Sequence, residues 1–97
     1  MDEFKPTSHA AGDPSLIEYP SRFPIKVMGL NADGFVHAVT SIAAQFDPAF
    51  DAASVELRPS RGEKYLGVTV TVTATSRAQL DELYRTLSTH PMVKMVL

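Results

Sequence analysis

The chain has 97 residues and no cysteine, which limits it to one small domain and excludes disulfides and thiolate metal sites. Hydrophobic residues make up 44% and charged residues 21%, as in soluble globular proteins, and no apolar run approaches the roughly 20 residues of a membrane helix. The formal net charge is −2, and the acidic excess lies in the first 21 residues, so this balance does not support nonspecific nucleic-acid binding.

Residues 1–15 are rich in Pro, Gly, Ser and Asp and hold almost no large apolar side chain, which predicts a flexible N-terminal tail. The first residues lack the basic start and the apolar run of a signal peptide, so we expect a cytoplasmic protein. Residues 16–21 carry enough apolar surface to lie against a domain, and Pro20 excludes a helix there. The predicted division is a tail over 1–15 and a single domain over 16–97.

The first strand is predicted over 23–29, where apolar residues alternate with Lys26 and Met28. A turn follows, and apolar residues then recur at helical spacing, which predicts a helix over 33–46. Pro48 ends this helix because the residue before a proline disfavours helical backbone angles.

The most regular pattern in the chain is the alternation of Val and Thr over residues 68–73. Strict alternation of β-branched apolar and polar residues predicts a strand with one buried and one solvated face, here over 65–75. A shorter strand is predicted over 54–59, and the Pro, Ser and Gly of residues 59–63 supply the turn chemistry of a hairpin between the two strands.

Ser76 and Gln79 form the capping-box pattern of a second helix, which leucines at helical spacing continue as far as His90 and Pro91. A fourth strand is predicted over 92–97. Simple alternation places Val93, Met95 and Leu97 on its inward face and Lys94 and Val96 on the other.

The predicted order of elements, βαββαβ, is the split-βαβ or ferredoxin-like plan of the α+β class. Right-handed crossovers place the strands in the order 4-1-3-2 in one antiparallel sheet, with both helices on one face. The other face is then left open. By alternation it carries Lys26, Met28, Glu56, Arg58, Thr69, Thr71, Thr73, Lys94 and Val96.

Several segments resemble the YbeD-like family of small bacterial proteins. They are Leu16–Pro20, Phe23 followed by Lys26–Gly29, Pro59 and Ser60 with Gly62 and Tyr65, the Val-Thr alternation, and the C-terminal Val93–Leu97. The resemblance covers residues 16–97 and implies an ACT-like βαββαβ domain in a bacterial cytoplasmic protein whose family has no settled biochemical activity. It transfers no catalytic residues to this chain.

The ACT likeness implies a small-ligand site in the turn between the first strand and the first helix. ACT domains carry an acidic residue, a proline and a glycine there, whereas this chain has Asn31 and Asp33 at the first two places, followed by Gly34. A glycine lets a ligand approach the backbone, and N–H groups at a helix start attract a carboxylate. Helix capping by Asn31 or Asp33 is the simpler interpretation. The candidate ligand-binding residues are Gly29, Asn31, Asp33 and Gly34.

The second candidate is a surface for a protein partner. The predicted hairpin is basic enough to suit an acidic partner or a phosphate, although Glu56 and Glu63 interrupt the basic run and a merely solvated hairpin is the simpler interpretation. Pairing between the sheets of two copies would enlarge the small core, which favours a homodimer. The candidate partner-binding residues are Lys26, Met28, Arg58, Arg61, Lys64, Thr69, Thr71 and Lys94.

No catalytic constellation, metal site or cofactor is predicted. The histidines at 9, 37 and 90 lack metal-ligand spacing, and no serine has an evident base. Asp47 and Asp51 are interpreted as turn formers rather than as paired catalytic carboxylates. Threonines stand where RNA-recognition domains place base-stacking aromatics, so nucleic acid is not an expected partner.

Two hypotheses from different classes therefore remain. The sequence favours a non-enzymatic regulatory or interaction module that uses the open sheet face and the hairpin. The alternative is an ACT-type sensor of an amino acid or an anionic metabolite that uses the turn after the first strand.

Overall fold

The structure is a computed structural model that describes residues 18–97, and the tail predicted over 1–15 lies outside the described residues. Its strands are β1 (Ser21–Leu30), β2 (Glu56–Pro59), β3 (Tyr65–Ala74) and β4 (Val93–Val96). Its helices are α1 (Phe35–Phe46) and α2 (Arg77–Ser88), with short 3-10 turns η3 (Ala52–Ser54) and η4 (Arg61–Glu63) on either side of β2. The predicted order βαββαβ is confirmed.

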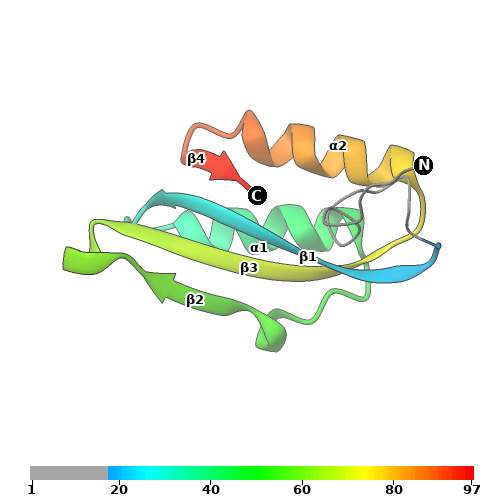
Figure 1. The fold of residues 1–97 in the computed structure, drawn as a ribbon, viewed down its shortest axis with the longest axis horizontal. Coiled ribbons are helices and arrows are strands. Elements are labelled where there is room, and N and C mark those ends of the chain that lie inside the picture. Colours follow the sequence, from blue (N-terminus) through cyan, green and yellow to red (C-terminus); the bar gives the residue numbers. More distant parts are fainter. Residues whose placement is uncertain (1–17) are drawn as a thin grey trace, which may run out of the picture.

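The four strands form one antiparallel sheet in the order β2-β3-β1-β4, which is the predicted order. The long central strands pair along their whole lengths, from Ser21 opposite Ala74 to Leu30 opposite Tyr65. Figure 1 looks onto this sheet, with α1 crossing behind β1 and β3 and with β2 at one edge. The architecture is the ferredoxin-like α+β plan.

The core lies between the two helices and one face of the sheet. Alternate residues of β1 and β3 point into it, and each helix adds one apolar stripe, so both helices cover the same face. The buried hydrophobic residues are Phe23, Ile25, Val27, Leu66, Val68, Val70, Val72 and Ala74 from the strands and Phe35, Val39, Ile42, Ala43, Leu80, Leu83 and Leu87 from the helices. The valines of the Val-Thr alternation are therefore the inward residues, as predicted.

The register of β4 differs from the prediction. The pairing between β1 and β4 shifts by one residue after Met28, which leaves Lys94 as the extra residue of a bulge. Val93 and Val96 consequently both pack against the core, whereas Met95 pairs directly with Met28 on the open face. The prediction that Val96 lies on the open face and Met95 on the inward face is wrong, because one unpaired residue reverses the alternation that follows it.

The start of α1 also differs from the prediction. The helix begins at Phe35, and its N-cap is Gly34, whose φ of 87° lies in the left-handed region that favours glycine. No side chain of residues 18–97 caps this helix. The interpretation of Asn31 or Asp33 as the cap is therefore wrong, and the Asn31 Nδ2 group instead donates a hydrogen bond to the Glu63 carbonyl oxygen at 3.1 Å.

Ser76 and Gln79 begin α2 as predicted, except that the return bond of the capping box goes to Thr75, the residue before the N-cap Ser76. The Ser76 Oγ atom accepts from the Gln79 N–H at 3.0 Å, and the Gln79 Oε1 atom accepts from the Thr75 N–H at 2.6 Å. The Gln79 Nε2 group also donates to the Phe46 carbonyl at 2.9 Å and to the Thr73 carbonyl at 3.2 Å. One side chain thus joins the end of α1, the end of β3 and the start of α2.

Asp47 and Asp51 form turns, as predicted. The Asp47 Oδ1 atom accepts from the Ala49 N–H at 3.0 Å, and the Asp51 Oδ1 atom accepts from the Ala53 N–H at 2.9 Å at the start of η3. Asp47 is also buried, and its Oδ2 atom accepts from the Thr73 N–H at 2.9 Å. This carboxylate therefore attaches the loop after α1 to the end of β3.

Candidate functional site

Gly29, the first of the predicted ligand-binding residues, is buried under α1. A Cβ atom at this position would clash with the Met92 carbonyl oxygen and would lie 2.7 Å from the nearest ring carbon of Phe35. Only a glycine allows these neighbours to pack against the strand. The absence of a side chain at Gly29 therefore serves the packing of α1 and of the turn before β4.

The other predicted ligand-binding residues are exposed in the turn between β1 and α1. Asn31 connects this turn to the hairpin, because its side chain binds the Glu63 carbonyl and its N–H donates to the Lys64 carbonyl at 2.9 Å. In the described part of the chain, no atom lies within 4 Å of the place where a Cβ on Gly34 would be. The turn thus presents an open helix start beside Asp33, whereas the Asn31 amide is already used.

The open face of the sheet is a grid whose rows follow from the strand pairing, because directly paired residues share a face. From β4 to β2, one row is Leu97, Lys26, Thr69 and Glu56, and the next row is Met95, Met28, Gly67 and Arg58. Leu30 and Tyr65 form a further row beyond Gly67, and Pro24 and Thr71 form one beyond Thr69. Leu97 enters this grid through two backbone hydrogen bonds with Lys26, which corrects its predicted inward placement.

Gly67 produces a hollow in the middle of the open face, because a strand glycine projects no side chain. A hollow of about 150 Å³ is lined by Lys26, Met28, Arg58, Pro59, Ser60 and Gly67. A wider one of about 310 Å³ adjoins it and is lined by Lys26, Glu56, Leu57, Arg58, Gly67 and Thr69. We call the two together the Gly67 hollow.

Two cationic side chains approach the Gly67 hollow from opposite sides, Lys26 from β1 and Arg58 from β2. Within residues 18–97 neither side chain has a carboxylate partner within 4.0 Å, and both ion pairs of this part of the chain lie on α2. Glu56 lines the wider part of the hollow but pairs with neither cation. Lys26 and Arg58 therefore line the hollow without an ionic partner among residues 18–97.

Apolar side chains lie beside the Gly67 hollow on the open face. Among residues 18–97, five large hydrophobic residues are between 36% and 60% exposed, and four of them lie on the open face. These four are Leu30, Tyr65, Met95 and Leu97. The half-buried Met28 lies among them, so the open face combines a cationic hollow with an apolar margin formed by these five residues.

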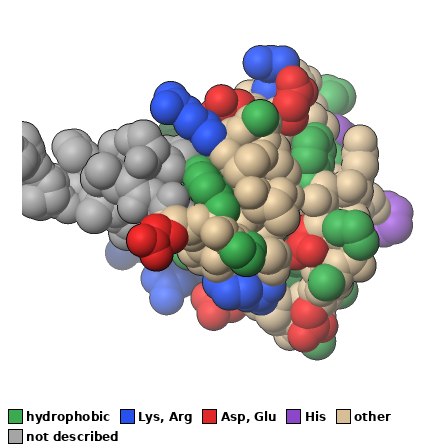
Figure 2. All heavy atoms as spheres, turned by 90° about the vertical axis from the view of Figure 1, so that its right-hand side faces the viewer, with side chains coloured by type: hydrophobic (Ala, Val, Ile, Leu, Met, Phe, Trp, Pro, Cys, Tyr) green, Lys and Arg blue, Asp and Glu red, His purple; other side chains and the backbone are tan. Residues whose placement is uncertain are grey.

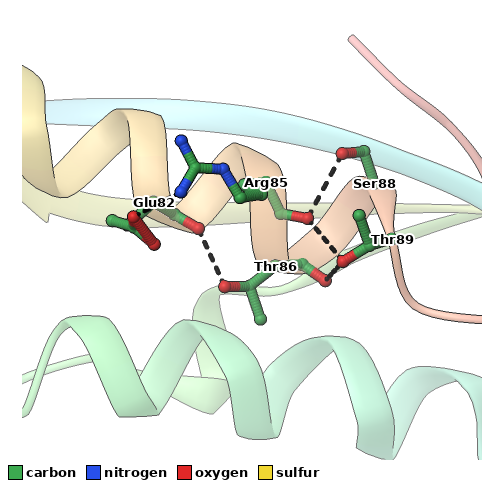
Figure 3. A network of polar contacts seen from close by, with 5 residues as sticks. All are labelled: Glu82, Arg85, Thr86, Ser88 and Thr89. Carbon is green, nitrogen blue, oxygen red and sulfur yellow. Dashed lines mark hydrogen bonds and ion pairs between the residues drawn. The ribbon is translucent and has the colours of Figure 1, made fainter.

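The exposed side of α2 is different, because its polar groups bond to one another (Figure 3). The Thr86 Oγ1 atom donates to the Glu82 carbonyl at 2.8 Å, and the hydroxyls of Ser88 and Thr89 both donate to the Arg85 carbonyl. The Arg85 guanidinium pairs with the Glu82 carboxylate at 2.7 Å. Figure 2 shows the end of the molecule at the right of Figure 1, where green, blue and red side chains are interspersed.

The structure brings together four of the eight predicted partner-binding residues at the Gly67 hollow: Lys26, Met28, Arg58 and Thr69. Thr71 follows on the same face of β3. Arg61 lies in η4 and Lys64 directly after it, where the Lys64 Nζ atom is 5.5 Å from the centre of the Tyr65 ring. Lys94 lies on β4, at the sheet edge opposite to β2, so the predicted basic residues do not form one patch.

Sequence reasoning missed Gly67, Ser60 and Met95 as members of this surface. One signal for Gly67 was present, because a glycine inside an alternating strand indicates a close backbone approach or a gap on one face. Met95 could not be placed without the bulge at Lys94. Ser60 was assigned to the turn alone, and its Oγ atom does accept from the Tyr65 N–H at 3.0 Å while also lining the hollow.

Residues 18–97 meet the requirements of neither a metal site nor a membrane-spanning helix. No three His, Asp or Glu side chains of this part gather closely enough to hold a metal ion. Neither of its helices has the length and apolar character needed to cross a bilayer. Burial raises the pKa of the Tyr84 hydroxyl above its ordinary value near 10.

The fold and the open face define a small α+β protein of the ferredoxin-like plan with one uncovered sheet surface. The sequence model of the family described as "Protein of unknown function (DUF493)" matches residues 14–97, and the chain belongs to this family. The resemblance to YbeD-like small bacterial proteins is thereby confirmed.

Two relatives illustrate how close this family membership is. A UPF0250 protein of Leptothrix cholodnii is 68% identical over 83 residues, which cover 86% of this chain and 91% of the relative. A UPF0250 protein of Janthinobacterium sp. (strain Marseille) is 56% identical over 97 residues, the whole of both chains. Neither name states a biochemical activity.

One solved structure shares the fold. The solution structure of protein HP0495 from H. pylori superposes with a TM-score of 0.69 over 97% of this chain and 98% of that one. The two sequences are 16% identical, so this likeness supports the ferredoxin-like architecture and nothing finer.

Proposed function

We propose that this protein is a non-enzymatic regulatory module that binds a protein partner through its open sheet face. The observation that carries the proposal is the position of the exposed apolar side chains, four of whose five large members in residues 18–97 lie on this face. Contiguous exposed apolar surface on a small protein marks an interaction site, and interfaces combine an apolar core with polar groups around it.

The helical side of the molecule is the poorer candidate for such an interface. The exposed hydroxyls of α2 and its charged pairs bond within the helix itself (Figure 3), so few of these groups need a partner. On the open face, by contrast, Lys26 and Arg58 have no ionic partner within residues 18–97. A docked protein would bury the apolar margin and supply counter-charges to these two groups.

The charge on the open face favours an acidic protein over a second copy of this chain. Among residues 18–97, the pairing places Arg22, Lys26 and Arg58 on this face and Glu56 as its only acidic residue. A face-to-face homodimer with twofold symmetry would bring these like charges together, which opposes association. A partner with exposed carboxylates meets no such repulsion.

Photo-cross-linking tests the proposal. A photoreactive benzoylphenylalanine in place of Thr71 reports contacts on the open face, and the same group in place of the exposed Ala44 reports contacts on α1. In an extract of the native bacterium we expect a discrete adduct from position 71 and none from position 44. Met95→Glu should abolish the adduct because it places a charge in the apolar margin.

The control for this experiment is Ala44→Glu, which adds the same charge on α1 and should leave the adduct unchanged. Urea unfolding of both variants establishes that they remain folded. Equal adducts from both positions, an adduct that survives Met95→Glu, or an adduct with the mass of two copies of this chain would overturn the proposal of an acidic partner on the open face.

An ACT-type sensor remains the second candidate function, and the open space around Gly34 is the observation that favours it. A helix start that no side chain of residues 18–97 caps can accept an anionic group from a small ligand. Amide-resolved NMR titration with amino acids and anionic metabolites distinguishes the two functions. Saturable amide shifts confined to residues 29–36 would support the sensor function, and unchanged amide shifts at these residues would exclude it.

A further inference from the structure

We infer that the Gly67 hollow binds a side-chain carboxylate of the protein partner, and that the partner segment also presents an apolar side chain to the neighbouring methionines. This inference rests on the proposed function and names the chemistry of the partner. It follows from the donors around the hollow, from the order of residues in one row of the open face, and from the absence of a side chain at Gly67.

The donors around the hollow suit a carboxylate. Arg58 can bind both carboxylate oxygens with its planar guanidinium, and Lys26 adds a second positive charge from the other side. Ser60 also lines the hollow, and its side-chain oxygen accepts from the Tyr65 N–H. Two cationic side chains without an ionic partner among residues 18–97 therefore line a space beside Gly67.

Glu56 determines where in the hollow a carboxylate would lie. It lines only the wider part, together with Thr69, and would repel an anion placed there. No acidic side chain of the described residues lines the narrower part, which is bordered by Pro59 and Ser60. We therefore place the partner's carboxylate at the mouth of the narrower part, next to Arg58, with the methylene groups of its side chain against the largely apolar lining.

The second requirement on the partner comes from the row that contains Gly67. This row continues through Met28 to Met95, so the side chains change from cationic to apolar across the sheet. Gly67 and Met95 lie two strands apart, which corresponds to roughly 10 Å. Methionine side chains adapt their shape to an apolar ligand. The partner thus needs an apolar group about 10 Å from its carboxylate, roughly three residues away in an extended segment.

A defined peptide tests this inference without knowledge of the partner. The probe is acetyl-Glu-Gly-Gly-Leu-amide, compared with the same peptide carrying Gln in place of Glu and with free glutarate, each titrated into the full-length labelled protein. We expect saturable amide shifts at Gly67 and its neighbours with the Glu peptide, and at least tenfold weaker binding of the Gln peptide and of glutarate. Equal binding of glutarate would assign the hollow to a free metabolite and overturn the inference.

Variants of the cations test the same assignment. The double variant Lys26→Gln with Arg58→Gln should weaken binding of the Glu peptide at least tenfold, because both positive charges that line the hollow are lost. Arg22→Gln is the matched control, since Arg22 lies on the same face and strand but outside the hollow and donates to the Thr73 Oγ1 atom at 3.2 Å. It should change the affinity less than twofold, and an equal loss would indicate only general charge attraction.

Filling the hollow provides an independent variant. In Gly67→Ala the added methyl group would have the Arg58 carbonyl oxygen as its nearest neighbour, at an ordinary contact distance of 3.5 Å, so the fold should persist. The methyl group occupies the floor of the hollow, and we expect at least threefold weaker binding of the Glu peptide. Unchanged binding would show that the peptide does not enter the hollow.

The cross-linking experiment separates failure of this inference from failure of the proposed function. If the double variant retains the adduct from position 71 while Met95→Glu abolishes it, the open face binds a partner but the carboxylate assignment is wrong. If the adduct also survives Met95→Glu, the proposed function is wrong. Loss of the adduct in the double variant, with retention in Arg22→Gln, supports both.

Discussion

The ring of Phe35 fills the space in which a side chain on Gly29 would have to lie. Its nearest carbon is 2.7 Å from the position of a Cβ atom on Gly29, and the Met92 carbonyl oxygen closes the same space from the other side. Phe35 is the first residue of α1 and is fully buried. Gly29, on the inner strand β1, thereby allows the start of α1 to pack closely against the sheet.

Gly29→Ala should accordingly lower the free energy of unfolding by about 1–3 kcal/mol, because an inserted methyl group forces its packed neighbours apart. Urea denaturation followed by circular dichroism measures the change. Gly67→Ala is the matched control on β3, where nothing crowds the added methyl group and the loss of chain entropy in the unfolded state should stabilise by about 0.4–1 kcal/mol. Similar effects of the two substitutions would contradict this account of Gly29.

Asn31→Asp should loosen the tip of the hairpin. The substitution removes the amide group that donates to the Glu63 carbonyl and places a negative charge against that oxygen. Because Asn31 is exposed, we expect a loss of stability of less than about 1 kcal/mol, with faster amide hydrogen exchange over residues 61–64. Asp33→Asn changes a neighbouring exposed residue and should leave hydrogen exchange at the hairpin unchanged. Equal exchange in the two variants would contradict the conclusion that the Asn31 side chain holds the hairpin tip.

Asp47→Ala should destabilise the protein by about 1–3 kcal/mol, because it leaves the N–H groups of Ala49 and Thr73 without their acceptor. Asp47→Asn retains one acceptor oxygen and should cost less. Asp51→Ala is the control, since Asp51 is exposed and accepts from Ala53 within its own turn. Thermal unfolding of the three variants should rank Asp47→Ala lowest, and any other order would be inconsistent with the structure.

The partly buried hydroxyl of Tyr84 leads us to expect a loss of stability at alkaline pH. Burial raises its pKa in the folded state above the unfolded value near 10, so the folded protein keeps a proton that the unfolded chain releases. The stabilisation is therefore complete below pH 10 and is lost as the pH rises through the folded pKa. Urea unfolding between pH 8 and 11 should show a smaller alkaline decline for Tyr84→Phe than for the wild-type protein, and identical declines would exclude this residue as the cause.

Local sequence patterns predicted most of the architecture because they report directly on burial. The Val-Thr alternation of β3 and the leucines of α2 each assign one face to the core. The capping box of Ser76 and Gln79 marked the start of α2 correctly. Strand order then followed from the handedness of the crossovers, which leaves few arrangements for a βαββαβ chain.

The candidate site was only half predictable, because it combines local and non-local features. Lys26, Met28, Arg58 and Thr69 were assigned to the open face by alternation alone, and each lines the Gly67 hollow. Their convergence on Gly67 depends on the pairing of three strands, which no single segment encodes.

The sequence alone was sufficient for the order of the elements, the inward faces of β1 and β3 and the family to which the chain belongs. Tertiary structure decided which residues of β4 face the core, because the unpaired Lys94 places Met95 on the open face. It also decided the start of α1, where Phe35 packs against Gly29. The physical reason is that alternation and helical spacing describe one segment at a time, whereas bulges, close backbone contacts and hollows arise only where separate segments meet.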